Sequence, residues 1–207
     1  ISSKSDINMR FASNNYRVPV ILSYWPTYAS LCAFFNAEKC FNSLILLCPD
    51  GIQNEIFKTE DDYGRTILHF ACFGGNLEII RKLFQAEYDL HVVDKNGYQI
   101  SHFAAMAGKI DVLKYLLMKG IEIVWSNENK MSPLHLACYY GNLDTVKFIC
   151  ENIDTRKVSL VNSYKSKTAL HFACDGGHVE VVDYLLNNYQ GIVKKQINQF
   201  DYTSFTP

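Results

Sequence analysis

A four-residue motif that begins with histidine recurs at a nearly constant interval along this chain. The sequence HFAC occurs at His69 and again at His171, and the variants HFAA and HLAC begin at His102 and His135. Successive histidines are separated by 33, 33 and 36 residues, and each is followed by an alanine two positions later and a glycine six positions later. A fixed period of about 33 residues, with a turn and two short helices in each unit, is typical of a solenoid whose units bury their apolar faces against one another.

The repeated unit resembles the ankyrin repeat, whose pattern runs Asp-x-x-Gly-x-Thr-Pro-Leu-His-x-Ala, then Gly, then Val-x-x-Leu-Leu. The first clear unit matches this pattern at Asp61, Gly64, Thr66, Leu68, His69, Ala71, Gly75, Ile80, Leu83 and Phe84. The resemblance covers the chain from about residue 26 onward and leaves roughly the first 25 residues outside. It implies an all-α ankyrin-repeat solenoid, built from helix-turn-helix units joined by turn or hairpin loops.

The register divides the chain into an N-terminal segment, a degenerate first repeat, four repeats and the start of another. In the degenerate repeat Thr27, Cys32 and Leu44 occupy the Thr, Ala and Leu columns. The repeat at 127–162 contains an insertion, and the last one opens with Asp201 and Thr206 in register. The expected boundaries are 1–25, 26–60, 61–93, 94–126, 127–162, 163–200 and 201–207. Because the chain starts with Ile1 and stops within a repeat at Pro207, we expect a fragment of a longer protein.

The histidine and cysteine of HFAC share one helix face, a spacing that suits a metal pair or a Cys/His nucleophile. The cysteine column, however, reads Cys72, Ala105, Cys138 and Cys174, so it accepts alanine. The resemblance implies instead that the histidine hydrogen-bonds the threonine hydroxyl and adjacent loops. The chain contains no phosphate-binding loop and no nucleophile elbow. We therefore expect no enzyme activity, no catalytic residue, no cofactor and no metal site.

Charge and hydropathy narrow the classes of partner. The 20 basic and 21 acidic side chains nearly cancel, so no general attraction to nucleic acid or anionic lipid is encoded. Apolar runs such as VPVILSYW are far shorter than the roughly 18 to 20 residues that span a bilayer. The seven cysteines form no CxxC pair, which indicates reduced thiols. We expect an intracellular, cytoplasmic protein with no nucleic-acid partner and no membrane insertion, and the oligomeric state stays open.

Function is then expected at positions that the repeat does not need for folding. In the ankyrin architecture these are the turn tips and the two residues before the glycine column, which line a concave groove. Aromatic residues and Met at such positions suit a protein interface, although 13 Tyr and 13 Phe also place rings elsewhere as ordinary packing. The candidate protein-binding residues are Tyr63, Arg65, Phe73, Tyr98, Met106, Met131, Tyr139, Tyr140, Tyr164 and Lys167. Among them, Tyr139 and Tyr140 are the best candidates for a hot spot.

Two functions remain open at this point. The first is a non-enzymatic protein–protein interaction scaffold or adaptor that binds its partner along the groove. The second is a targeting or regulatory arm of a larger enzyme or channel whose catalytic part lies outside this sequence. A nucleotide- or lipid-sensing repeat would need clustered basic residues, but Arg65, Lys95, Lys165 and Lys167 are spread over three tips.

The second clear repeat departs most from the pattern. It reads QISH where the family has TPLH, so Gln99 replaces the capping threonine and Ser101 replaces the core leucine. Loss of a cap and of apolar contact both destabilise a helix pair. We therefore expect the locally weakest part of the stack near residues 94–110.

Overall fold

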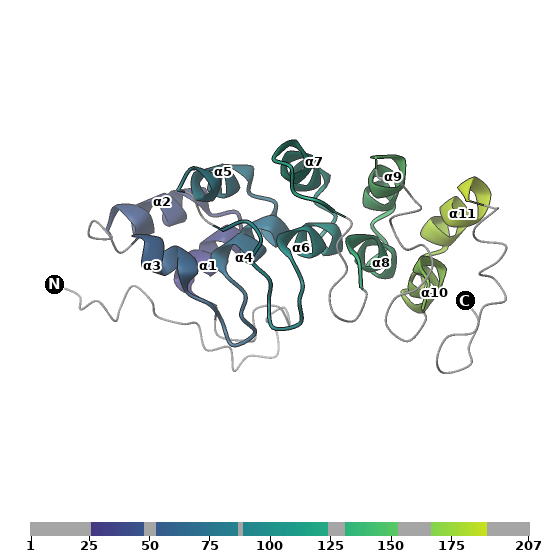
Figure 1. Ribbon diagram of the computed structural model, residues 1–207, viewed down its shortest axis with the longest axis horizontal. Coiled ribbons are helices and arrows are strands. Elements are labelled where there is room, and N and C mark those ends of the chain that lie inside the picture. The colour runs from purple at the N-terminus through teal and green to yellow at the C-terminus, as the bar shows by residue number, and fades with distance from the viewer. Residues whose placement is uncertain (1–25, 48–52, 87–88, 124–130, 153–166, 190–207) are drawn as a thin grey trace. The chain divides into compact units, whose positions relative to one another are not determined.

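The computed structural model describes residues 26–47, 53–86, 89–123, 131–152 and 167–189 of the chain. These residues form α-helices and their connecting turns, together with one isolated antiparallel bridge between Val93 and Gln99. The chain divides into two compact units, Ile1–Ile100 and Ser101–Pro207. Within each unit, the first helices of the repeats form one row and the second helices form another (Figure 1). The all-α fold class expected from the repeat pattern is confirmed.

The first unit contains two helix pairs and a short helix between them. Its helices are α1 (Tyr28–Phe34), α2 (Glu38–Leu46), α3 (Gln53–Lys58), α4 (Ile67–Gly74) and α5 (Leu77–Gln85). Helix α1 packs against α4, and α2 packs against α5 (Figure 1). The buried side chains of α5, which include Ile79, Ile80 and Leu83, face this interior.

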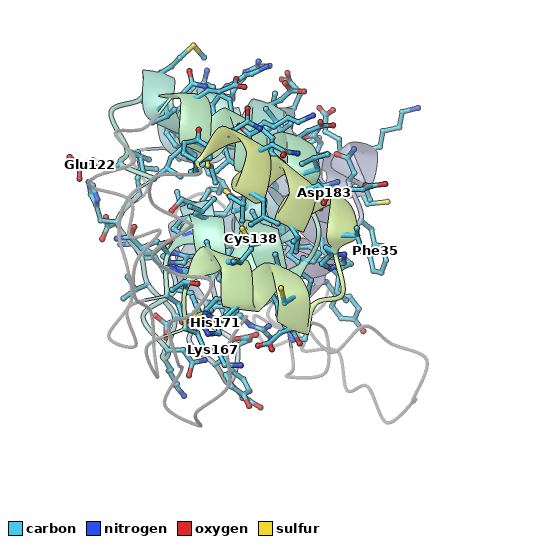
Figure 2. All side chains as sticks on the ribbon, turned by 90° about the vertical axis from the view of Figure 1, so that its right-hand side faces the viewer. Phe35, Glu122, Cys138, Lys167, His171 and Asp183 are labelled. Atoms are coloured by element: carbon cyan, nitrogen blue, oxygen red, sulfur yellow. The ribbon has the colours of Figure 1, made fainter. Side chains whose placement is uncertain are left out.

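The second unit contains three helix pairs, the first of which begins at the boundary. Its helices are α6 (Ile100–Met106), α7 (Ile110–Met118), α8 (Pro133–Tyr139), α9 (Leu143–Asn152), α10 (Ala169–Asp175) and α11 (Val179–Asn188). Helix α8 packs against α10, and α9 packs against both α7 and α11. Cys138 lies in the interior between the two rows of helices (Figure 2), which fits a small apolar side chain at a close helix contact.

Three of the first helices begin with the same hydrogen-bonded cap. Thr66, Ser132 and Thr168 are the N-cap residues of α4, α8 and α10, and each is followed three positions later by a histidine of the repeated motif. In α8 the His135 Nδ1 accepts from the Ser132 backbone N–H at 3.1 Å and lies 2.9 Å from the Ser132 hydroxyl oxygen. Such a box satisfies amide groups that a helix start leaves unpaired. The expected bond between the histidine and the hydroxyl is confirmed.

The histidine of the second clear repeat bonds to an adjacent loop. His102 Nε2 lies 3.0 Å from the carbonyl oxygen of Met131. Ser101, beside it, is fully buried, and its hydroxyl oxygen has no hydrogen-bond partner. A buried hydroxyl without a partner loses its bonds to water and gains none in return. This supports the expectation of a weak point near Ser101.

A left-handed turn follows the first helix of each repeat. Gly75, Gly108, Gly141 and Gly177 have φ angles between 68° and 86°. In the degenerate first repeat the same column holds Asn36, the one non-glycine residue with positive φ in the described part of the chain. Asparagine tolerates this conformation better than other side chains do. Asn36 therefore fixes the register of the degenerate repeat, which the sequence pattern indicates only weakly.

Candidate protein-binding surface

Two exposed tyrosines mark the end of α8. Tyr139 is the last residue of the helix and Tyr140 its C-cap, and their side chains are 43% and 48% exposed. The ring centroids lie 5.2 Å apart in an edge-to-face arrangement, and the ring of Phe172 on α10 lies 6.4 Å from that of Tyr139. We call Tyr139, Tyr140 and Phe172 the tyrosine cluster. The structure brings two of the candidate residues together there, as expected from their adjacent positions.

The backbone beneath the tyrosine cluster is fixed by the next repeat. His178 Nε2 donates to the carbonyl oxygen of Tyr139 at 2.9 Å. A Cβ atom on Gly176 would lie 2.2 Å from the same oxygen, so only glycine allows this approach. The hydrogen bond from His178 holds the backbone of Tyr139 in place. Because position 176 has no side chain to cover the rings, the tyrosine cluster keeps exposed ring surface above this fixed backbone.

The preceding repeat of the second unit uses the same kind of clamp. Asn142 Nδ2 donates to the carbonyl oxygens of Ala105 and Met106, at 3.0 and 2.9 Å. Asn142 and His178 occupy equivalent positions after α8 and α10, so both tie a second helix to the end of the preceding first helix. The half-buried Met106 is therefore also held through its backbone.

Charge at the edge of the tyrosine cluster is balanced. Lys167 Nζ pairs with the carboxylate of Asp175 at the end of α10, the helix that contains His171 (Figure 2). Burial, and secondarily the neighbouring Tyr139, raises the pKa of Tyr140 above its ordinary value. Both effects leave the Tyr140 hydroxyl neutral near physiological pH. The cluster thus offers apolar ring surface with hydroxyl groups rather than a strong charge.

The first unit has a matching aromatic cluster that the sequence reasoning missed. The ring of Phe34 stacks on that of Phe73 with centroids 5.2 Å apart and meets the ring of Phe35 edge-on at 4.9 Å. Phe35 is 62% exposed. We call Phe34, Phe35 and Phe73 the phenylalanine cluster. Placing Asn36 in the glycine column would have revealed it, because Phe34 and Phe35 are then the two residues before that column.

The two clusters share one backbone arrangement within their own units. A Cβ atom on Gly74 would lie 2.6 Å from the carbonyl oxygen of Phe34. Gly74 thus approaches the residue before Phe35 as Gly176 approaches the residue before Tyr140. In both units a pair of aromatic residues is followed, one repeat later, by a glycine that lacks a side chain to cover them.

Two candidate residues are not where we expected them. Arg65 is buried: its Nε donates to Asp61 Oδ2 at 2.7 Å, and its guanidinium lies over the Phe70 ring at 5.1 Å. Met131 is also buried, and its carbonyl lies within hydrogen-bond distance of His102. The expectation that both side chains lie at free turn tips is therefore wrong. Arg65 instead closes the turn before α4, and Met131 is buried two residues before the start of α8.

The remaining candidates are only partly accessible or fall outside the part of the chain that the structure describes. Tyr63, Phe73, Tyr98, Met106 and Lys167 are half-buried. Tyr63 lies under the Arg65 guanidinium, 5.6 Å from ring centroid to carbon, and its carbonyl accepts from the Lys95 backbone N–H at 2.8 Å. Tyr164 lies outside the described residues.

Burial favours the neutral forms of three titratable groups of the repeat motif, Cys72, Cys138 and His135. Burial raises the pKa of the Cys72 and Cys138 thiols, so neither is a thiolate at physiological pH. Burial, and then the neighbouring His102, lowers the pKa of His135 to about 4.

Within the described ranges no three His, Cys, Asp or Glu side chains gather as a metal site would require. None of the helices that the structure describes has both the length and the apolar character to cross a bilayer.

Comparison with protein families agrees with this architecture. A family model for three copies of the ankyrin repeat matches residues 29–127 and again 124–201. A comparison with curated proteins gave no match. Ankyrin repeats are generally protein–protein interaction modules and are typically non-catalytic. The match covers well over half of the sequence, and this chain belongs to the ankyrin repeat family.

Proposed function

We propose that this chain is a non-enzymatic scaffold or adaptor that binds another protein at the ends of its first helices. The observation that carries the proposal is the tyrosine cluster, in which two adjacent rings are nearly half exposed above a clamped backbone. Folding does not explain this exposure, since equivalent positions hold Met106, Ala107 and Asp175 in the sister repeats.

The chemistry of the cluster suits a protein partner. Tyrosine supplies a large, rigid contact area with a polar tip and loses little conformational entropy on binding. The clamp on the Tyr139 carbonyl reduces that loss further, because the helix end does not need to be ordered by the partner. A hot spot of this kind contributes about 2 kcal/mol or more of binding free energy.

Because Lys167 and Asp175 neutralise each other at the edge of the tyrosine cluster, a partner segment with both apolar and polar groups is favoured. The Lys167–Asp175 pair contributes no net charge, so contact depends on ring faces and hydroxyl hydrogen bonds rather than on electrostatic steering. We infer an extended segment or a loop whose apolar side chain packs against Tyr139 and Tyr140 and whose backbone bonds their hydroxyl groups.

Site-specific photo-crosslinking tests this proposal. A benzophenone side chain placed at Tyr140 should form a covalent adduct with one partner in cells that express the protein. The adduct should be lost when Tyr139 is changed to alanine in the same chain. The matched control is the same side chain at Tyr28, an exposed tyrosine outside the cluster. The proposal fails if position 140 gives no adduct, or if position 28 gives the same adduct at the same yield.

A further inference from the structure

A pocket opens on the second helices of the first unit, away from the ends of its first helices. It has a volume of about 620 Å³ and lies among α2, α3 and α5, the elements at the purple and blue end of Figure 1. Its apolar wall is formed by Phe41, Ile45, Leu46 and Phe57. The rings of Phe41 and Phe57 are buried and stack with centroids 6.3 Å apart, which gives the pocket a rigid floor. The volume falls in the range of roughly 300 to 1,000 Å³ that is usual for binding sites.

The rim of the pocket exposes leucines that the repeat does not need. Leu46 is 84% exposed and the adjacent Leu47 is 76% exposed. Counted from the left-handed turn, the equivalent pairs in the other repeats are Gln85 and Ala86, Met118 and Lys119, Glu151 and Asn152, and Asn187 and Asn188. Since polar or small residues serve at most of these positions, folding does not account for two leucines. Adjacent exposed leucines beside an apolar hollow indicate a contact surface.

One positive charge, that of Lys82 on α5, lies at the edge of the pocket. Lys82 Nζ donates to Asn42 Oδ1 at 2.6 Å and lies 3.3 Å from Glu38 Oε1. The side chains of Lys82 and Glu38 are both well exposed, so this ion pair is weak and exchangeable. An ammonium group has three donors, and these two contacts leave capacity for one further acceptor. A carboxylate brought by a ligand therefore has a partner at this edge.

We propose that this pocket is a docking site for an amphipathic α-helix of a partner protein. Large apolar side chains on one stripe of that helix enter the pocket against Ile45 and Phe57, and a carboxylate on its flank meets Lys82. Leu47 distinguishes this occupant from a small ligand: it lies outside the pocket lining, and a molecule confined to the pocket would leave it in water. A helix laid along the groove between two helices covers both leucines, as in helix-in-groove recognition.

The test uses a defined peptide rather than an unidentified partner. The probe is a fluorescein-labelled peptide of about 18 residues with leucines on one helical stripe and glutamates on its flanks. Two comparison peptides are an isomer with scattered leucines and a version with lysine for glutamate. Fluorescence polarisation with the full chain should show the first peptide binding at least about fivefold tighter than either comparison.

Variants of the chain locate the binding. The double change Leu46→Gln and Leu47→Ala installs the residues of the next repeat and should weaken the peptide at least about fivefold with an unchanged melting temperature. Lys82→Gln should remove the preference for glutamate over lysine. The matched control is Met118→Gln, which alters the equivalent exposed position in the second unit and should leave binding unchanged. Tyr139→Ala should also leave it unchanged, which separates this site from the proposed function.

Several outcomes would overturn the inference. It fails if the wild-type chain binds none of the peptides, or if the isomer binds as tightly as the amphipathic peptide. An equal loss of peptide affinity in the Met118→Gln variant would show that the peptide binds outside this pocket. A dimer that the double leucine change dissolves, measured by light scattering, would assign the pocket to a second copy of the chain. Saturable binding of dodecanoate without peptide binding would assign it to a small amphiphile.

Discussion

The first helices differ between their N-terminal ends, where capping and packing determine the residues, and their C-terminal ends, where the residues vary from repeat to repeat. The start of α8 is buried: Ser132 and His135 form the cap, and Leu134 between them has almost no exposed surface. The other end of the same helix carries Tyr139 and Tyr140, which are nearly half exposed. The starts of α4 and α10 have the same cap chemistry, whereas the residues at their ends differ. The start of the helix therefore maintains the fold, whereas its end is free to vary and forms the binding surface that we propose.

The largest effect is expected at the buried start of α8. Changing Leu134 to alanine removes apolar contact from a packed interior and leaves a cavity. It should lower the free energy of unfolding by about 2 to 5 kcal/mol. Denaturant titration followed by circular dichroism measures this loss. A loss below about 0.5 kcal/mol, the range of a surface change, would contradict the assignment of this end to the fold.

His135, at the same buried start of α8, should make the free energy of unfolding depend on pH. His135 titrates near pH 4 in the folded chain and near its reference value of 6.5 when unfolded, so between these values the unfolded state binds more protons. Stability from the neutral histidine is complete above pH 6.5 and is lost as pH falls toward 4, by an amount on the order of 3 kcal/mol.

The control for this pH effect is a chain in which residue 135 does not titrate. Urea midpoints measured from pH 7 to pH 4 should fall less steeply for His135→Gln than for the wild type. Equal slopes for the two chains would show that His135 is not responsible.

One residue at the end of α10 belongs with the fold rather than with the surface. Gly176 precedes the glycine column like Tyr140, but a Cβ atom there would meet the Tyr139 carbonyl oxygen at 2.2 Å. Gly176→Ala should therefore cost about 1 to 3 kcal/mol through backbone displacement. Thermal melting measures it, with Ala107→Gly as the comparison at the equivalent position. A neutral effect of Gly176→Ala would show that this contact is not tight.

A smaller effect of opposite sign is expected in the repeat where Gln99 stands at the position of the capping threonine. Ser101 occupies the core leucine column with a buried hydroxyl that has no partner, so Ser101→Leu should stabilise the chain by about 1 kcal/mol. Hydrogen exchange should show faster opening near residues 94–110 than in α10 and α11, and the substitution should slow it. Uniform exchange, or destabilisation by leucine, would contradict a weak point at this helix start.

The sequence predicts well those structural features that depend on residues close together in the chain. The left-handed glycines and the bond from histidine to the capping hydroxyl depend on residues three to six positions apart, so Thr66, His69 and Gly75 suffice to predict them. Turn tips depend on tertiary contacts as well. Arg65 has the position of a surface residue, yet it folds back onto Asp61 and Phe70, which no pattern of spacing indicates.

The degenerate first repeat shows a second limit of prediction from the sequence. Its Thr27 is in register, but no histidine follows three positions later, so the repeat pattern is weak around Phe34 and Phe35. The spacing from Thr27 already places these rings in the same columns as Tyr139 and Tyr140, and the positive φ of Asn36 agrees with it. The pocket beside Leu46 could not be predicted either, because it depends on how α2, α3 and α5 pack.

The most direct test of the account compares the two ends of α8 in a single experiment. The double variant Tyr139→Ala and Tyr140→Ala and the single variant Leu134→Ala are each measured for melting temperature and for affinity to the partner that crosslinks at position 140. We expect the tyrosine variant to lose about 2 kcal/mol or more of binding free energy while losing no more than about 0.5 kcal/mol of stability per site. The leucine variant should lose several times more stability. Wild-type affinity in the tyrosine variant, or melting as early as that of the leucine variant, would show that both rings belong to the packed interior and not to a binding surface.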